Sequence, residues 1–165
     1  MKPALLVIDI QNAFLDISSV MTQSINEAIR YTNAAIDLFR EKELPIIAVQ
    51  HMNEADKLVP GEAGFDLPES LKILPSDVHI HKTYSNSFNR TPLINHLREL
   101  GVDTVVLTGF CAEHCVLSTY RGAQDCDLTP VMLRGSLASD VLENILFVER
   151  ISDTISLGAL RKFLS

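Results

Sequence analysis

The chain has 165 residues, of which 47% are hydrophobic and 21% charged, and a formal net charge of −7. This length is typical of one domain that buries roughly 70% of its unfolded surface, so we expect residues 1–165 to form a single domain. The negative charge argues against a nucleic-acid partner, and no segment approaches the ~20 continuous apolar residues that cross a membrane. Three cysteines without the spacing of a disulfide framework favour a reducing cytoplasm.

Apolar strands and amphipathic helices alternate along the chain. The first apolar run ends in an aspartate and has no small-residue cleavage site after it, which predicts a strand and not a signal peptide. Helices are predicted where apolar residues recur at helical spacing between capping signals. The predicted strands are Leu5–Ile10, Pro45–His51, Val78–Lys82, Val105–Leu107, Leu128–Leu133 and Asp153–Ser156, and the predicted helices are Met21–Lys42, Thr91–Leu100, Glu113–Ala123, Ser139–Arg150 and Leu157–Leu164.

This alternation predicts an α/β fold, a three-layer α/β/α sandwich around a mostly parallel, Rossmann-like sheet of about six strands. Such folds bind ligands at the carboxyl ends of their strands. Asp9, Lys82 and Cys115 all follow or end predicted strands, so we expect them to meet at that edge. The segment Asn53–Asp77, rich in proline and glycine, is predicted to be a long surface loop of the kind that forms lids or substrate walls.

The stretch Val105–Val116 runs from a strand through Gly109 to a cysteine at a predicted helix start. Unpaired backbone N–H groups and the helix dipole favour negative charge there, so the pKa of Cys115 is predicted to be lowered. We accordingly expect Cys115 to react with iodoacetamide near neutral pH much faster than Cys126. The alternative interpretation is that Cys115 is a small buried hydrophobe, as many free cysteines are.

A nucleophilic thiol needs a proton acceptor and a nearby cation. Asp9 could accept the thiol proton and later return it to a leaving amine, while Lys82 could hold the thiolate and the carboxylate together. The backbone N–H groups of Cys111 and Cys115 are the candidates for stabilising the negative charge that develops on an attacked carbonyl oxygen. The implied reaction is acyl transfer to Cys115, loss of an amine or ammonia, and hydrolysis by water.

At this point the sequence resembles the isochorismatase-like cysteine hydrolases, which include nicotinamidases, N-carbamoylsarcosine amidase and ureidoacrylate-type amidohydrolases. The segments that carry the resemblance are LLVIDIQNAF (Leu5–Phe14), HKTYSNSF (His81–Phe88) and GFCAEHCV (Gly109–Val116), with PGEAGFDL (Pro60–Leu67) between them. The resemblance implies a cysteine-dependent hydrolase that cleaves a C–N bond of a small amide, carbamoyl compound or ureide through a thioester, with Asp9, Lys82 and Cys115 as its catalytic residues.

The same resemblance implies a cis peptide bond at Phe110–Cys111 and a substrate pocket walled by Phe14 and Phe88, although both phenylalanines could equally be core residues. Further pocket candidates are Gln11, His51, Phe110 and His114. The resemblance also implies that the protein forms a homodimer or homotetramer, acts on a small-molecule substrate and needs no cofactor.

Nicotinamidases carry an Asp-x-His metal motif on the second strand, but the corresponding segment here ends Val49-Gln50-His51. No metal is therefore expected. His79 and His81 share one face of a predicted strand and could ligate a metal, but no third ligand is evident near them.

Three alternative functions stay open from the sequence. A vinyl ether hydrolase of the isochorismatase type is possible, although the cysteine favours C–N hydrolysis. Cys111 and Cys115 could form a redox pair, which would leave Asp9 and Lys82 without a role. A nucleotide- or flavin-binding module is disfavoured because neither glycine-rich phosphate motif is present.

Overall fold

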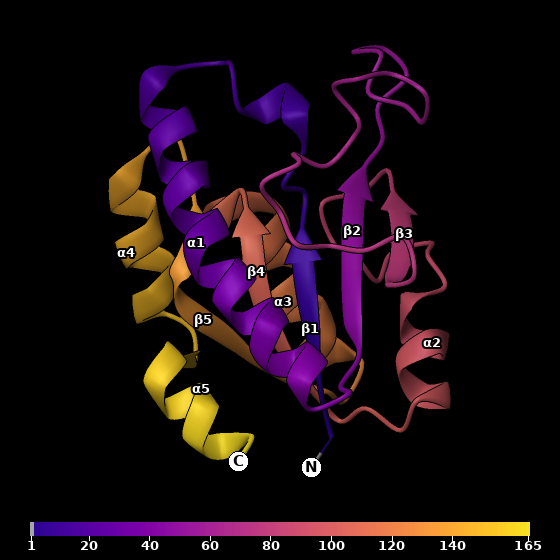
Figure 1. Ribbon diagram of the computed structural model, residues 1–165. Coiled ribbons are helices and arrows are strands. Elements are labelled where there is room, and N and C mark those ends of the chain that lie inside the picture. Colours follow the sequence, from indigo (N-terminus) through magenta and orange to yellow (C-terminus); the bar gives the residue numbers. More distant parts are fainter. Residues whose placement is uncertain (1) are drawn as a thin grey trace.

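A computed structural model describes residues 2–165 of the chain, and its centre is a six-stranded parallel sheet (Figure 1). The strands lie in the order β3-β2-β1-β4-β5-β6, and every neighbouring pair is parallel. The predicted α/β class and sheet are thereby confirmed. The strands are β1 (Pro3–Ile8), β2 (Ile46–His51), β3 (Val78–Lys82), β4 (Thr104–Phe110), β5 (Thr129–Ala138) and β6 (Thr154–Ile155).

Helices cover both faces of the sheet and complete the predicted three layers. One face carries α1 and α5, and the other carries α2, α3 and the inner side of α4. Figure 1 shows α1 and α5 in front of the sheet and α3 behind it. The helices are α1 (Ser19–Glu41), α2 (Leu93–Glu99), α3 (Leu117–Asp125), α4 (Leu142–Arg150) and α5 (Leu157–Phe163), with short turns η1 (Asn12–Phe14) and η2 (Ala112–Val116).

The central strand β1 explains why the chain begins with an uninterrupted apolar run. All six of its residues are buried, because neighbouring side chains point to opposite faces and both faces are covered. Leu5 and Val7 belong to the core under α1, whereas Leu6 and Ile8 belong to the core under α2 and α3. The carboxyl end of this strand is therefore held rigidly from both sides.

Two element boundaries differ from the prediction in ways that affect the strand ends. Strand β1 ends at Ile8, because Asp9 has a φ of 51° in the left-handed region and turns the chain out of the sheet. The predicted helix at Glu113–Ala123 is divided: Cys115 lies in the π-helical turn η2, and α3 begins only at Leu117. Cys115 is thus not in the first turn of a regular α-helix.

Gly109 is required by the close approach of β4 to β1. It lies beside Ile8 with a φ of 124°, and a Cβ atom there would stand 2.0 Å from the Ile8 carbonyl oxygen. Only glycine combines this backbone conformation with this contact. The predicted turn is in fact a strand position that brings the end of β4 against the end of β1.

The first half of the 53–77 loop lies at the carboxyl ends of β1 and β2, where the Phe65 carbonyl oxygen accepts from Gln11 and Gln50, and the second half lies along α1, where Asn33 bonds Ser70 and Lys72. A single bridge pairs Asn53 with Leu58, and Phe65 and Leu71 bury their side chains in the body of the protein. The loop is thus anchored by apolar contacts at more than one point. No helix within residues 2–165 is long and apolar enough to cross a membrane.

Candidate active site

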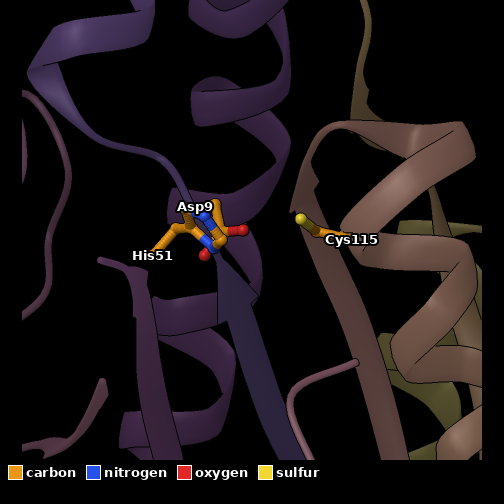
Figure 2. Close-up of side chains that lie close together, drawn as sticks. All are labelled: Asp9, His51 and Cys115. Atoms are coloured by element: carbon orange, nitrogen blue, oxygen red, sulfur yellow. The ribbon is translucent and has the colours of Figure 1, made fainter. Parts of the chain in front are cut away.

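The ammonium group of Lys82 joins the three residues that the sequence places at the strand ends. Its Nζ donates to Asp9 Oδ2 at 2.6 Å and to Cys115 Sγ at 3.3 Å. It also lies 3.2 Å from His51 Nδ1. Figure 2 shows Asp9, His51 and Cys115 converging, with a carboxylate oxygen of Asp9 directed toward the Cys115 sulfur.

Three separate elements bring these side chains together. Asp9 follows β1 and is fixed by its backbone N–H, which donates to Val49 O at 2.9 Å. Lys82 ends β3 beside His51 in the strand register, and its long side chain reaches across the end of β2 to Asp9. Cys115 enters from the η2 turn after β4. Adjacent strands lie about 4.8 Å apart, so a shorter side chain at position 82 could not span the gap.

Asp9 has a buried carboxylate, and only one of its two oxygens accepts a hydrogen bond within residues 2–165. Its side chain is only 2% exposed, and burial raises its pKa although the Lys82 ammonium acts in the opposite direction. Oδ2 accepts the Lys82 hydrogen bond, whereas Oδ1 has no hydrogen-bond partner among the described residues. A carboxylate with a raised pKa and a free lone pair is suited to accept a proton.

The Cys115 thiol does not have the predicted lowered pKa. Burial, followed by the negative charge of Asp9, raises its pKa to about 12, and the Lys82 ammonium only partly offsets this. The prediction was wrong because the sulfur lies in a partly buried π-helical turn beside a carboxylate, and not at an exposed helix start. At neutral pH the group is therefore a thiol, whose proton must leave during attack.

His51 is held neutral with a defined tautomer. Burial and the Lys82 ammonium lower its pKa, with Asp9 acting in the other direction. An ammonium group has no lone pair, so His51 Nδ1 must accept the hydrogen bond from Lys82 and the ring proton sits on Nε2. The third ammonium proton of Lys82 is therefore donated to His51, and this hydrogen bond helps to fix the direction of the Lys82 side chain.

A cavity of about 290 Å³, called here the Cys115 cavity, opens beside the sulfur. Four of the predicted pocket residues line it: Phe14, His51, Phe110 and His114. The Phe14 and Phe110 rings pack at 5.0 Å between centroids and form an apolar wall. The remaining lining residues, Met21 from α1 and Asp140 before α4, were not predicted, since neither lies at the end of a predicted strand or in a motif.

Two predicted pocket residues, Gln11 and Phe88, do not line the Cys115 cavity, and their role in substrate binding stays a prediction. Gln11 is fully buried, and its side-chain amide donates to the carbonyl oxygens of His51 and Phe65 at 3.1 Å while accepting from the His51 N–H at 2.8 Å. It therefore ties the end of β2 to the 53–77 loop. Phe88 packs against the core between the sheet and α2, which was its alternative interpretation.

Glu113 stabilises the η2 turn that carries Cys115, and the sequence analysis did not assign it a role. It accepts hydrogen bonds from Cys111 Sγ at 3.0 Å, Ser139 Oγ at 2.9 Å and Asn144 Nδ2 at 2.7 Å. Burial opposes ionisation of Glu113, but these bonds hold its pKa below the usual range. Burial and Glu113 together raise the pKa of Cys111 to about 12. The feature of the sequence that could have indicated this role is the acidic residue Glu113, two positions before Cys115.

The Phe110–Cys111 peptide bond is cis, as the resemblance implies. It places the Cys111 amide at the start of the η2 turn, next to the Cys115 cavity. That the N–H groups of Cys111 and Cys115 bind a developing oxyanion stays a prediction.

Asp9, His51 and Cys115 are also a possible metal-ligand group, since their ligand atoms lie within 4.8 Å of one another. The Lys82 ammonium lies within hydrogen-bonding distance of all three, so a cation of the chain itself already occupies the position between them. Cys111, Glu113 and His114 form a second such group, in which Cys111 and Glu113 are hydrogen-bonded to each other.

The two histidines of β3 point away from this site. His79 Nε2 lies 3.1 Å from the Leu74 carbonyl oxygen, and His81 packs edge-on against Phe65 with ring centroids 5.0 Å apart. Their contacts therefore fasten the 53–77 loop to β3.

The fold and the cysteine site together are those of the isochorismatase-like hydrolases. A family model described as the Isochorismatase domain matches residues 3–139, and the chain belongs to this family. The Bacillus subtilis protein YrdC, described as an uncharacterized isochorismatase family protein, is 33% identical, with 73% of this chain and 65% of YrdC aligned. Ureidoacrylate amidohydrolase RutB from Cronobacter sakazakii is 26% identical (73% and 67% aligned), and Nicotinamidase 3 from Arabidopsis thaliana is 25% identical (73% and 65% aligned). The chain thus spans about two thirds of these relatives.

Solved structures show the same architecture. An isochorismatase-like hydrolase from Alkaliphilus metalliredigens superposes with a TM-score of 0.91 at 23% identity over 100% of both chains. N-carbamoylsarcosine amidase from Thermoplasma acidophilum superposes with a TM-score of 0.81 at 23% identity, covering 95% of this chain and 97% of that one. At this level of identity the likeness concerns the fold alone.

Proposed function

We propose that this hydrolase is a cysteine-dependent amidohydrolase that cleaves a C–N bond of a small amide, carbamoyl compound or ureide. The observation that carries the proposal is the Lys82 ammonium, 2.6 Å from a buried carboxylate and 3.3 Å from the Cys115 sulfur. Names of relatives support the bond type, since RutB is named an amidohydrolase and Nicotinamidase 3 a nicotinamidase, and hydrolysis of an amide breaks a C–N bond.

The reaction begins with the thiol and the carboxylate. As the Cys115 sulfur attacks the substrate carbonyl carbon, its proton passes to Asp9, whose free Oδ1 lone pair can accept it. A general base is needed because a thiol with a pKa of about 12 is not ionised at neutral pH. The Lys82 ammonium stabilises the negative charge as it moves from Asp9 to sulfur and carbonyl oxygen.

The tetrahedral intermediate then collapses. Asp9 returns the proton to the leaving nitrogen, the C–N bond breaks, and a thioester on Cys115 is left together with an amine or ammonia. A water molecule loses a proton to Asp9 and attacks the thioester; the C–S bond then breaks, the carboxylic acid is released, and Asp9 returns the proton to the Cys115 sulfur. We assign the backbone N–H groups of Cys111 and Cys115 to the negatively charged oxygen in both steps.

The side chains of Cys111 and Cys115 are poorly suited to the alternative of a redox pair. Thiol–disulfide exchange needs a thiolate, yet burial raises the pKa of both thiols to about 12. The Cys111 thiol is in addition hydrogen-bonded to Glu113.

The test is an assay of ammonia or amine release against a panel of small amides, carbamoyl compounds and ureides, with an enol ether included for the vinyl ether alternative. We expect hydrolysis of at least one C–N substrate, and Cys115→Ala and Asp9→Asn should each lower kcat by about a hundredfold or more. Cys126→Ala is the control and should leave the rate unchanged. Turnover of the enol ether alone, or a Cys115→Ala enzyme of normal rate, would overturn the proposal.

A further inference from the structure

A second cavity, of about 400 Å³, adjoins the Cys115 cavity. Phe14 and His51 line both, so the two cavities are neighbours that share these side chains, and together they are called the groove here. The second cavity, called here the Asp56 cavity, is lined by apolar residues that include Ile17 and Leu58 and by the polar residues Asn53 and Asp56. No step of the proposed reaction uses it.

The fixed charges on this groove are negative. Asp140 lines the Cys115 cavity and forms no hydrogen bond or ion pair within residues 2–165. Asp56 accepts a hydrogen bond from Asn53 Nδ2 at 2.6 Å, but no cation of the described chain pairs with it. None of the residues that line either cavity is a lysine or an arginine.

The Lys82 ammonium group beside Cys115 is not free to bind a substrate anion. Lys82 is 1% exposed, and its three protons are directed to Asp9, His51 and Cys115. Inside the groove, the nine-tenths buried Asp9 presents an oxygen without a hydrogen-bond partner. A substrate carboxylate would therefore meet negative charge with no lysine or arginine among the lining residues, whereas an ammonium group would find partners.

We infer that the groove selects a substrate with a reactive amide at Cys115 and a cationic amine carried on an apolar linker, whose amine lies against Asp56. Methylene groups fit the Phe14 and Ile17 side chains, and the charge fits the carboxylate of Asp56. The inference deepens the proposed function and rests on it for the bond that reacts, but not for the charge that the groove attracts.

Charge selection can be measured without turnover by modifying Cys115 with two methanethiosulfonates of opposite charge. The Cys115 sulfur forms a disulfide with the aminoethyl or sulfonatoethyl group of the reagent, methanesulfinate leaves, and the thiol proton passes to the solvent. Relative to N-acetylcysteine amide, we expect the cationic reagent to be favoured about tenfold or more at low salt, and less at high salt. Asp140→Asn should reduce this preference, whereas Glu143→Gln, an exposed neighbour outside the cavity, should not.

The Asp56 cavity is tested by amides that differ only at their far end. Hexanamide, 6-aminohexanamide and adipamic acid, with shorter homologues of each, are compared by kcat/KM for ammonia release. We expect the amino amides to be favoured over the neutral amides by about fivefold and the acids to be the poorest substrates. Asp56→Asn should remove the amino preference, and Glu54→Gln, in the same loop but outside the cavity, should keep it.

The two experiments separate the possible failures. If the acids are hydrolysed as fast as the amino amides, or if the anionic reagent modifies Cys115 as fast as the cationic one, the inference is wrong. If no amide is hydrolysed but the cationic reagent is still favoured, the charge selection stands and the proposed function fails.

Discussion

Replacing Lys82 with methionine removes the cation from a fully enclosed ion pair. The Lys82 and Asp9 side chains are 0% and 2% exposed, and their charged atoms are 2.6 Å apart. Methionine keeps the apolar stem but leaves the Asp9 carboxylate without a counter-ion, which costs about 3–5 kcal/mol of unfolding free energy in such settings. We therefore expect Lys82→Met to lower the free energy of unfolding by this amount at neutral pH.

The loss of stability caused by Lys82→Met should also depend on pH. Burial raises the pKa of Asp9 and Lys82 lowers it, so without Lys82 the folded-state pKa lies still further above its unfolded value. The folded variant then binds a proton more readily than the unfolded chain, and its stability rises as the pH falls through the folded pKa. The destabilisation should accordingly shrink toward acidic pH, and Asp9→Asn should restore part of the lost stability in the double variant.

Urea unfolding followed by circular dichroism measures these differences. The matched control is Lys72→Met, since Lys72 Nζ also lies 2.6 Å from a carboxylate, Asp37 Oδ2, but with side chains that are 52% and 57% exposed. This exposed pair should contribute about 1 kcal/mol or less. Equal effects of Lys82→Met and Lys72→Met, or a loss below about 1 kcal/mol at Lys82, would refute the assignment of a buried charge pair.

Four further predictions follow from other contacts. Iodoacetamide should modify Cys115 no faster than Cys126 at neutral pH, because burial raises the pKa of the Cys115 thiol to about 12; fast, selective modification followed by peptide mass mapping would contradict this. As the pH rises, the thiols of Cys111 and Cys115 lose their protons in the unfolded chain before they do so in the folded protein. The free energy of unfolding should therefore fall above about pH 9, by about 1.4 kcal/mol per pH unit for each thiol, and Cys115→Ala should make this fall less steep in thermal unfolding. Gly109→Ala should destabilise the protein by about 3 kcal/mol or more, since its Cβ would lie 2.0 Å from a carbonyl oxygen; a near-normal denaturation midpoint would rule out this packing. Glu113→Gln should cost about 1–3 kcal/mol and lower kcat, because three hydrogen bonds end on that carboxylate, whereas unchanged urea unfolding would show that these bonds do not hold the turn.

The sheet and the meeting of three side chains at its edge could be predicted from local patterns. Apolar runs covered on both faces mark parallel strands, and parallel strands present their carboxyl ends at one edge, so the sequence predicts that Asp9, Lys82 and Cys115 meet there. The α1 core residues likewise follow helical periodicity, whereas the helix begins at Ser19, before the predicted Met21, where the Ser18 side chain caps it by accepting from the Met21 N–H at 3.1 Å.

Features that depend on tertiary contacts could not be predicted in this way. The pKa of Cys115 depends on how deeply the sulfur is buried and on which charge lies closer, and neither quantity is local in sequence. Gln11 was a pocket candidate, but its hydrogen bonds are made with residues 40 and 54 positions away. Asp140 reaches the cavity because β5 continues to Ala138, beyond the predicted Leu133.

The most direct test of catalysis by Cys115 is the mass of the protein during turnover. A sample quenched in acid with a hydrolysed amide should carry an added acyl group, mapped by peptide mass to Cys115 and absent from Cys115→Ala, and the adduct should disappear when substrate is exhausted. Steady turnover with no adduct on Cys115, and a Cys115→Ala enzyme that keeps its rate, would contradict nucleophilic catalysis by this thiol.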